Sequence, residues 1–332
     1  MTNFLKAFNF SRVCAVYSSF VTLWYLLWLS IGDEVWWIVL LNRAATYLFI
    51  PAFLLLASAL LIRRIRSALS LLFPILIFVT LYYPYFIPKP AKSVDESASL
   101  EVMTYNVLFS NSDYGAVADV ILTYQPDLVA LQEVQPDMMS ALITRLQNDY
   151  PHYLMGTRNN FGTTAVFSRH AFLDTQVLDL QADRPAVIVK TRIMGRVVTF
   201  VSVHLLAYNL WWTALKDVPA TVMKRTRDQN RQANLVLQAV SDESGMTIIG
   251  CDCNSYETSS SYRILDGSLE NAARQTGFMI SLVDLPGIRQ DTSLTHIDYV
   301  WSRGDIAPMR VFKILDNGGS DHLPVLATFE MD

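Results

Sequence analysis

The stretch Ser320-Asp321-His322-Leu323-Pro324 decides the interpretation of this chain. It follows the turn residues Gly318-Gly319 and precedes the apolar run Val325-Leu326-Ala327-Thr328-Phe329, which indicates a loop at the mouth of a strand. In such a loop Asp321 can hold a hard metal ion while His322 handles a proton. Because an Asp-His pair also occurs by chance, the interpretation depends on polar residues elsewhere in the chain.

Polar side chains also stand at the ends of predicted strands upstream. Loops at strand mouths often carry binding and catalytic residues, so these positions are candidates for a site. They are Asn106, Glu133, His204, Asp252, Asn254 and Asp298. Taken singly, each also fits a structural role, such as a solvated strand end or a buried histidine.

The residue types at these positions suit phosphoryl transfer. Glu133 offers the oxygen ligands that Mg²⁺ prefers. Asp252 and Asn254 are two residues apart, so on an extended chain a carboxylate that orients water faces the same way as an amide that holds phosphate. Asp298 can orient a catalytic histidine, as such histidines require.

Residues 1–90 carry three apolar stretches of membrane-spanning length. They are Val13–Ile31, Ala44–Ile62 and Ala68–Ile87, and a spanning helix needs roughly 20 mostly apolar residues. We therefore expect three transmembrane helices within residues 1–90, a linker at 91–99 and a soluble domain at 100–332. The run Val35–Leu41 is too short to span, and its tryptophans predict an interfacial segment. A cleavable signal peptide is the alternative for the first stretch, but no small-residue cleavage site follows Leu29.

The distribution of positive charge predicts the orientation in the membrane, because basic residues favour the cytoplasmic side. The basic residues that flank the apolar stretches are Lys6, Arg12, Arg63, Arg64 and Arg66. Asp33 and Glu34 mark the opposite side, and Arg43 is an exception. With three crossings, the soluble domain of this multi-pass protein lies on the extracytoplasmic side, and a miscount of one helix reverses this prediction.

Two of the three cysteines, Cys251 and Cys253, flank Asp252. A bridge between residues i and i+2 demands unfavourable geometry, so we expect small buried thiols on a strand and no disulfide. The lack of disulfides mildly disfavours an extracytoplasmic domain, but the charge pattern outweighs it.

Strand and helix signals alternate through the soluble part. The expected strands are Leu100–Phe109, Asp127–Val134, Thr163–Ser168, Ala186–Ile193, Val197–His204, Met246–Cys251, Ile297–Ser302 and Val325–Glu330. The expected helices are Ala116–Tyr124, Pro136–Asn148 and Val218–Val240. Many strands with interspersed helices predict two sheets packed face to face with helices outside.

In their order and flanking residues, the strand-end motifs resemble those of the endonuclease/exonuclease/phosphatase superfamily, the DNase I-like hydrolases. The matching stretches are Met103–Val107, Leu131–Val134, Gly162–Arg169, Val203–Leu205, Gly250–Ser255, Ile297–Val300 and Ser320–Pro324. The resemblance covers residues 100–330 and is specific for the superfamily, not for a substrate. It implies a four-layer α/β sandwich and Mg²⁺-dependent hydrolysis of a phosphoester, with Mn²⁺ as the alternative metal.

The resemblance also implies a metal-binding set. Carried over to this sequence, Glu133 is the principal ligand, and Asn106 and Asp321 lie close to the metal or the phosphate. In the family pattern Gly precedes and an aromatic residue follows the Asp of the Asp-x-Asn motif, whereas Cys251 and Cys253 stand there in this chain. Both cysteines are small enough to preserve the strand.

The same resemblance implies the catalytic roles. Asp252 orients or deprotonates the attacking water, while Asn254 and His204 bind the phosphoryl oxygens. His204 can also protonate the leaving group. His322, held by Asp298, is the second proton-handling group, and the choice of Asp252 or His322 as the base stays open.

The substrate is predicted from the context of the motifs, since superfamily members cut nucleic acids, phosphoinositides and sphingomyelin. A short linker keeps the domain near the bilayer, and Trp211 and Trp212 in an apolar segment after His204 suit a lipid interface. We therefore expect a lipid head group, as for a sphingomyelinase or phosphoinositide phosphatase. A membrane-anchored nuclease is the second hypothesis. It ranks lower because nucleic-acid affinity comes largely from Lys and Arg, and residues 100–332 hold 18 Lys and Arg against 26 Asp and Glu. A non-catalytic membrane interaction module is the third hypothesis.

Overall fold

The computed structural model of the chain describes residues 10–87, 99–157, 163–181, 184–241, 245–277 and 296–331. Nearly all of the predicted linker 91–99, and Gly162 of the motif stretches, lie outside these residues. The described chain forms two compact units. The first unit comprises Met1–Tyr83, Leu210–Thr226 and Tyr256–Ser260, and the second comprises Pro84–Asn209, Arg227–Ser255 and Ser261–Asp332.

Apolar helices form most of the first unit. They are α1 (Phe10–Ile31), α2 (Trp36–Arg43), α3 (Ala45–Leu48), α4 (Ile50–Leu61) and α5 (Ile65–Tyr82), which continues into the short 3₁₀ helix η2 (Tyr83–Tyr85). Two of these helices are long and apolar enough to cross a membrane, Phe10–Ile31 and Ile65–Tyr85. Their Leu, Ile and Phe side chains remain exposed in the protein, as expected for a surface that faces lipid.

The predicted second span is not one straight helix. Helices Trp36–Arg43 and Ala45–Leu61 are long and apolar enough to cross a membrane only when taken together, and they are bent by 74° at the break between them. The break falls at Ala44, whose backbone (φ −96°, ψ 9°) departs from the helical region, and Pro51 in the first turn of α4 suits a new helix start. The described part of the chain therefore has two candidate spans that are each one continuous helix, and one broken span or re-entrant loop.

Polar contacts inside the first unit join the turn between α1 and α2 to the segment Tyr256–Ser260. The buried Asn42 side chain accepts from Trp24 Nε1 (3.0 Å) and donates to Asp33 Oδ1 (2.6 Å). The other oxygen of Asp33 accepts from the backbone N–H of Ser260 (2.6 Å). Thr258 Oγ1 donates to the Asn42 carbonyl (2.6 Å). These bonds satisfy polar groups that would be costly to bury unpaired.

The second unit contains two six-stranded sheets in its described residues. The first has the order β11-β12-β1-β2-β4-β3, and the second has the order β5-β6-β7-β8-β10-β9. The strands of the first sheet are β1 (Ser99–Asn106), β2 (Leu128–Gln132), β3 (His152–Gly156), β4 (Thr164–Ser168), β11 (Ala307–Lys313) and β12 (Val325–Glu330). Those of the second are β5 (Phe172–Asp179), β6 (Pro185–Ile193), β7 (Arg196–His204), β8 (Met246–Asp252), β9 (Glu270–Asn271) and β10 (Asp298–Arg303).

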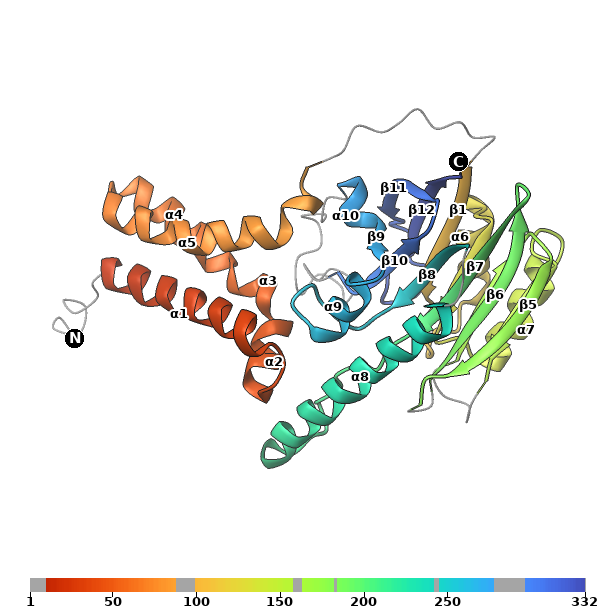
Figure 1. The fold of residues 1–332 in the computed structure, drawn as a ribbon, viewed down its shortest axis with the longest axis horizontal. Helices are drawn as coiled ribbons and strands as arrows, with labels where there is room; N and C mark the ends of the chain where they lie inside the picture. Colours follow the sequence, from red (N-terminus) through yellow and green to blue (C-terminus); the bar gives the residue numbers. More distant parts are fainter. Residues whose placement is uncertain are drawn as a thin grey trace. The chain divides into compact units, whose positions relative to one another are not determined.

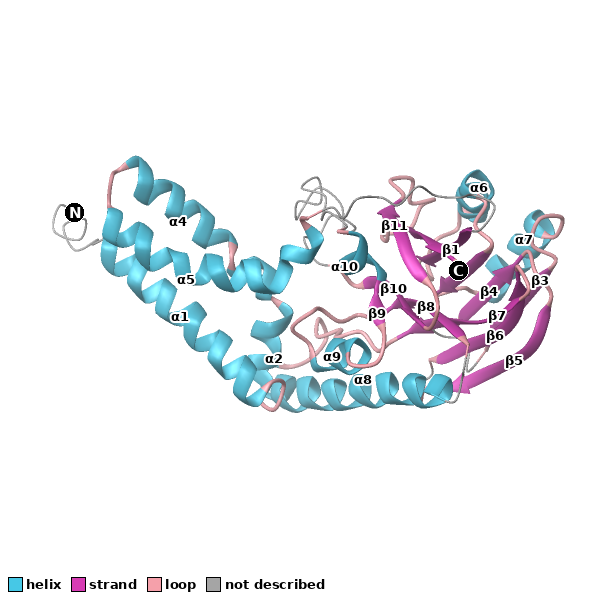
Figure 2. Ribbon diagram, turned by 45° about the horizontal axis from the view of Figure 1, so that its top comes forward, coloured by secondary structure: helices cyan, strands magenta, loops and turns pink. Residues whose placement is uncertain are grey.

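Helices cover the outer faces of both sheets (Figure 1). On the first sheet, α6 (Tyr114–Tyr124) and α7 (Pro136–Leu146) share one apolar core with β1, β2 and β4. On the second, α9 (Ser260–Asp266) and the C-terminal half of α8 (Val218–Ser241) share a core with β6, β7, β8 and β10. Figure 2 shows α6 and α7 on one side of the strands and α8 on the other. The short helix α10 (Ala272–Thr276) follows β9. This arrangement confirms the predicted four-layer α/β sandwich.

The two sheets pack closely where β8 crosses β1 and β2. A Cβ atom at Gly250 would lie 2.7 Å from Cβ of Ala130 and 2.9 Å from Cβ of Thr104, so a larger residue does not fit there without displacement. This close approach brings the ends of β1 and β2 next to the end of β8, where the candidate residues lie.

Candidate functional site

The register of the second sheet places three candidate residues in one row. His204 at the end of β7 pairs with Asp252 at the end of parallel β8, and Asp252 pairs with Asp298 at the start of antiparallel β10. All three side chains are buried. Strand pairing alone therefore brings together residues that are 94 positions apart in the sequence, from 204 to 298.

The first sheet contributes Asn106 and Glu133. The Asn106 amide nitrogen donates to Glu133 Oε1 (3.2 Å) and to Asp252 Oδ2 (2.8 Å), so it joins the two sheets. Glu133 has a left-handed backbone (φ 63°), which is uncommon for a residue other than glycine and is concentrated at functional sites. Its Oε2 accepts from the backbone N–H of Phe109 (2.9 Å), which fixes the second carboxylate oxygen.

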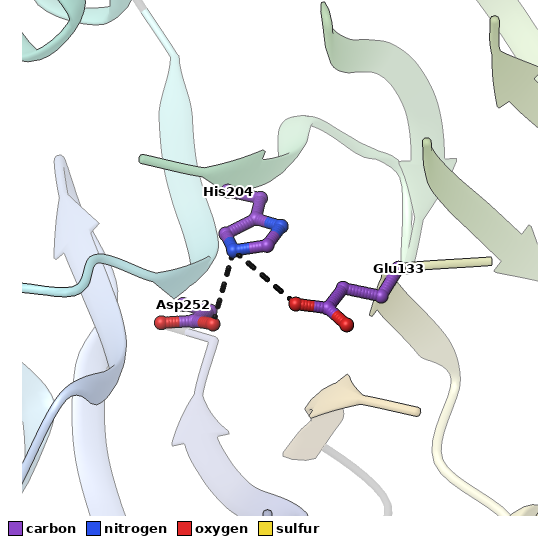
Figure 3. A group of neighbouring side chains, drawn as sticks. All are labelled: Glu133, His204 and Asp252. Carbon is purple, nitrogen blue, oxygen red and sulfur yellow. Dashed lines mark ion pairs between the residues drawn. The ribbon is translucent and has the colours of Figure 1, made fainter. Parts of the chain in front are cut away.

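His204 lies between the carboxylates of Asp252 and Glu133 (Figure 3). Its Nε2 is 3.3 Å from Asp252 Oδ2 and 3.8 Å from Glu133 Oε1. Burial lowers the pKa of His204 well below its ordinary value, and the positive charges of Arg184 and His322 lower it further. This shift favours the neutral imidazole, which can donate from one nitrogen and accept at the other.

His322 lies on the other side of Asp252. Its Nδ1 is 2.9 Å from Asp298 Oδ2, and its Nε2 is 4.0 Å from Asp252 Oδ2. Burial alone would lower the pKa of His322, but the negative charges of Asp298, Asp252 and Asp321 raise it to about 10. The pKa values of the two histidines are thus shifted in opposite directions.

Asp252 lies at the centre of the site, and Asn254 lies at its edge. Burial raises the pKa of Asp252, the positive charge of His322 lowers it, and the first effect is the larger. Asn254, with a left-handed backbone (φ 46°), donates from its side chain to the Leu205 carbonyl (3.1 Å). This bond ties the loop after β8 to the loop after β7, next to His204.

The carboxylates of this site suit a divalent cation. Two groups of side chains have ligand atoms within 4.8 Å of one another, Glu133-His204-Asp252 and Asp252-Asp298-His322. Asp321 belongs to neither group, yet its buried Oδ1 has no hydrogen-bond partner among the described residues. Burial, and then the charge of Glu133, raise its pKa despite the opposing charge of His322. Because Mg²⁺ prefers oxygen ligands, we favour a set built on Glu133 and Asp321 over one that includes His204.

Trp211 and Trp212 do not take part in this group of side chains. They belong to the first unit, in the segment Leu210–Thr226, and are 90% and 95% exposed. Side chains so exposed are not part of a buried core. Their predicted role in substrate binding stays a prediction.

The expectation of free thiols at Cys251 and Cys253 is wrong. The two residues form a disulfide with a Cα–Cα distance of 5.1 Å. The bridge flanks Asp252 on both sides and is fully buried. Since Cys253 lies just beyond the end of β8, the chain at this position has left the strand geometry that the expectation assumed.

Other residues of the site carried no signal in the sequence. The Phe109 N–H that contacts Glu133 is a backbone group, and Gln229 of α8 contacts backbone carbonyls of the loops after β7 and β8. Asn106 was expected near the metal or phosphate, but its bond to Asp252 across two sheets depends on the packing of those sheets.

The ion pair of Asp298 with His322 gives a testable result. In metal-free protein, Asp298→Asn should lower the pKa of His322 from about 10 towards its ordinary value, because the largest stabilising charge is removed. A raised pKa in the folded state adds stability below the unfolded-state pKa of about 6.5. That contribution is lost as the pH rises through about 10, so the wild type should lose more thermal stability than the variant over this range.

Imidazole NMR titration and pH-dependent thermal unfolding measure these two effects. Asp119→Asn is the control, since Asp119 is an exposed carboxylate paired with Arg145 on the outer helices. Equal His322 titration in the wild type and Asp298→Asn would contradict the assignment.

Comparison with known proteins agrees with the resemblance that the sequence motifs indicate. The model of the Endonuclease/Exonuclease/phosphatase family matches residues 103–322. A search of curated proteins found no match. Similar solved structures include an endonuclease/exonuclease/phosphatase from Beutenbergia cavernae, with a TM-score of 0.57 and 20% identity over 70% of this chain and 72% of that one.

Two further structures share the fold. The human Nocturnin catalytic domain, solved with a bound sulfate anion, has a TM-score of 0.56 and 19% identity over 71% of this chain and 95% of that one. D. rerio TDP2, complexed with a single-strand DNA product, has a TM-score of 0.53 and 18% identity over 70% and 99%. At these identities the likeness concerns the fold.

Proposed function

Because the chain belongs to the endonuclease/exonuclease/phosphatase family, we propose that it is a membrane-anchored, divalent-metal-dependent hydrolase that cleaves a phosphoester of a lipid head group. The observation that carries the proposal is the position of Asp252 between two imidazole rings. Its Oδ2 lies 3.3 Å from Nε2 of His204 and 4.0 Å from Nε2 of His322. A carboxylate with proton-handling groups on both sides suits the positioning and charge stabilisation that phosphoryl transfer needs.

Glu133, Asn106 and Asp321 would hold the cation, Mg²⁺ or Mn²⁺. The buried oxygen of Asp321 without a hydrogen-bond partner and the fixed orientation of Glu133 support this set. When bound, the metal supplies Lewis-acid activation of a phosphoryl oxygen.

The remaining side chains would divide the work on substrate and water. Asp252 orients the attacking water, while His204 and Asn254 donate hydrogen bonds to the phosphoryl oxygens. His322 presents Nε2 towards Asp252 because Asp298 holds its other ring nitrogen. Either Asp252 or His322 accepts the proton of the water, and the pH–rate profile of Asp252→Asn distinguishes them.

A lipid substrate is supported by the composition of the first unit. Besides the apolar helices, this unit contains the segment Leu210–Thr226, in which Trp211, Trp212 and Leu215 are each at least 90% exposed. Monomeric proteins rarely expose such clustered apolar side chains to water without a binding role. Tryptophan favours the interface between bilayer and water, so the cluster suits insertion among lipid head groups.

An extracytoplasmic location of the catalytic domain is supported by two features. The basic residues that flank the spans, such as Arg63, Arg64 and Arg66, favour a cytoplasmic turn between α4 and α5. The disulfide between Cys251 and Cys253 suits an oxidising compartment, since cytosolic disulfides are rare. The test is a reporter enzyme that works only in the cytoplasm, fused after residue 332. Activity of this reporter would contradict the extracytoplasmic location.

The function is tested with the purified full chain in lipid nanodiscs. Sphingomyelin, phosphoinositides, other glycerophospholipids and single-stranded DNA are offered with Mg²⁺, with Mn²⁺ and with EDTA, and His322→Ala is the inactive control. We expect metal-dependent release either of a phosphorylated head group from a phosphodiester lipid or of inorganic phosphate from a phosphoinositide. Preferential cleavage of DNA would contradict the lipid substrate and favour the nuclease hypothesis. No turnover of any substrate would favour a non-catalytic membrane module.

The exposed aromatic cluster gives a second test. Trp211→Ser combined with Trp212→Ser should lower turnover of lipid in vesicles about 10-fold or more, because removing two interfacial anchors weakens contact with the bilayer. Turnover of a soluble phosphodiester such as bis(p-nitrophenyl) phosphate should not change. The exposed Tyr153→Ser on β3 is the matched control. Equal losses on both substrates would show that the cluster acts on fold and not on lipid.

A further inference from the structure

Gln229 is a buried amide on α8 that faces the two loops of the candidate site. Its side chain is 1% exposed, although it lies in a long helix whose outer positions are charged. A buried amide is costly unless its donors and acceptor are satisfied, so its partners indicate why the position is polar.

The amide nitrogen of Gln229 contacts backbone carbonyls from both loops. It is 2.9 Å from the carbonyl of Leu206, 3.2 Å from that of Cys253 and 2.9 Å from that of Asn254. Its oxygen accepts from Ser261 Oγ (2.8 Å), on the side away from the loop carbonyls. All five residues belong to the second unit.

Gln232, one helical turn further, completes the contact with the first loop. Its oxygen accepts from the backbone N–H of Leu206 (2.8 Å), and its nitrogen donates to the carbonyl of Gln181 (3.2 Å). Residues three apart lie on one face of a helix, so the two glutamines act on the same side of α8. Together they satisfy loop groups that have left the strand ladder.

The loops that these amides hold carry the proposed phosphoryl-binding residues. Leu206 is two residues after His204, and Asn254 is itself one of the Gln229 partners. The two loops also meet directly, because the Asn254 side chain donates to the Leu205 carbonyl (3.1 Å). A single side chain, Gln229, therefore spans both loops from the side of the helix.

We propose that Gln229 is a positioning residue that sets the separation of the His204 loop and the Asn254 loop, so that both side chains can reach one phosphoryl group. This inference rests on the proposed hydrolase function. Gln229 contacts only backbone groups and Ser261 among the contacts given above, so its effect on the reaction is exerted through the loops.

The test compares Gln229→Met with Ser261→Ala in the full chain in nanodiscs. Methionine has a similar length but no amide, so it loses all the loop contacts. Ser261→Ala removes a buried hydrogen bond of the same amide and leaves its contacts with the loops. We expect Gln229→Met to lower kcat about 10- to 100-fold, because small misplacements of binding groups have effects of that size. The Mn²⁺ concentration that gives half-maximal activity should change by less than about twofold.

Ser261→Ala should change kcat less than about threefold, and Gln229→Asn, which keeps a shorter amide, should fall between the two. The Gln229→Asn variant also covers the case in which Gln229→Met does not fold. If kcat falls equally in Gln229→Met and Ser261→Ala, or stays at the wild-type value in Gln229→Asn, the positioning role is wrong.

Hydrogen–deuterium exchange separates this inference from the proposed function, since it needs no activity. Gln229→Met should speed exchange in peptides that cover residues 204–207 and 253–256, with no change in peptides from β1 and β2. Unchanged exchange in both loops would overturn the positioning role. An inactive wild type with faster loop exchange in the variant would overturn the hydrolase function alone.

Discussion

Asp252→Asn should lower kcat for phosphoester hydrolysis about 10²- to 10⁴-fold, the range for loss of a general acid–base group. Asparagine has the same shape, so the buried position between His204 and His322 is preserved. Its amide cannot take a proton from water. In either orientation it also presents a donor to a donor, because Asn106 Nδ2 donates to one oxygen of Asp252 and the backbone N–H of Asn254 donates to the other. Steady-state kinetics on the preferred substrate measure the effect.

Asp119→Asn, the exposed control, should retain full activity, and both variants should unfold within a few degrees of the wild type. The pH–rate profile assigns the base. Loss of the acidic limb in Asp252→Asn identifies Asp252, whereas an unchanged limb identifies His322. A variant that keeps more than about a tenth of wild-type kcat would contradict a central role for Asp252 in either case.

Glu133→Gln should weaken Mn²⁺ binding at least about 100-fold, since even changes to groups behind the ligands cost 10- to 100-fold in affinity. The substitution keeps the side-chain length but removes the charge, and it offers an amide where Asn106 and the Phe109 N–H both donate. Activity at limiting metal should fall in parallel, and partial recovery at high metal is expected. Mn²⁺ binding is followed by electron paramagnetic resonance.

Two controls define this experiment. Glu270→Gln changes an exposed carboxylate of β9 and should leave Mn²⁺ affinity unaltered. Asp321→Asn should weaken Mn²⁺ binding less than Glu133→Gln but more than the control. Wild-type Mn²⁺ affinity in Glu133→Gln would remove Glu133 from the metal site and favour the Asp252-Asp298-His322 group instead.

The sequence predicted the inner strands and missed the edges. Every strand inside the two sheets was expected, within a few residues of its observed bounds. The strands that were not expected, β3, β5, β9 and β11, each lie at the edge of a sheet. An inner strand is covered on both faces and reads as a continuous apolar run. The exposed positions along β5 interrupt such a run, as Phe172–Asp179 shows.

The sequence predicted those residues of the candidate site that lie at the ends of strands. His204, Asp252 and Asp298 stand at strand ends, and their pairing follows from the sheet order. The role of Gln229 depends on which face of α8 meets the loops, and no local pattern in the sequence specifies that face. The disulfide was excluded by assuming an extended chain through Cys253, where the chain has left the strand.

The segment Tyr256–Ser260 has a consequence for dividing this protein into parts. It begins two residues after Asn254, yet it belongs to the first unit, where Asp33 accepts from the Ser260 N–H and Asn42 accepts from Thr258. A fragment cut at the sequence boundary near residue 99 would lose those acceptors and leave the segment next to Asn254 without them. The helices of the first unit are therefore not interchangeable with other helices, because a chain that carried replacements would also need substitutes for Asp33 and Asn42.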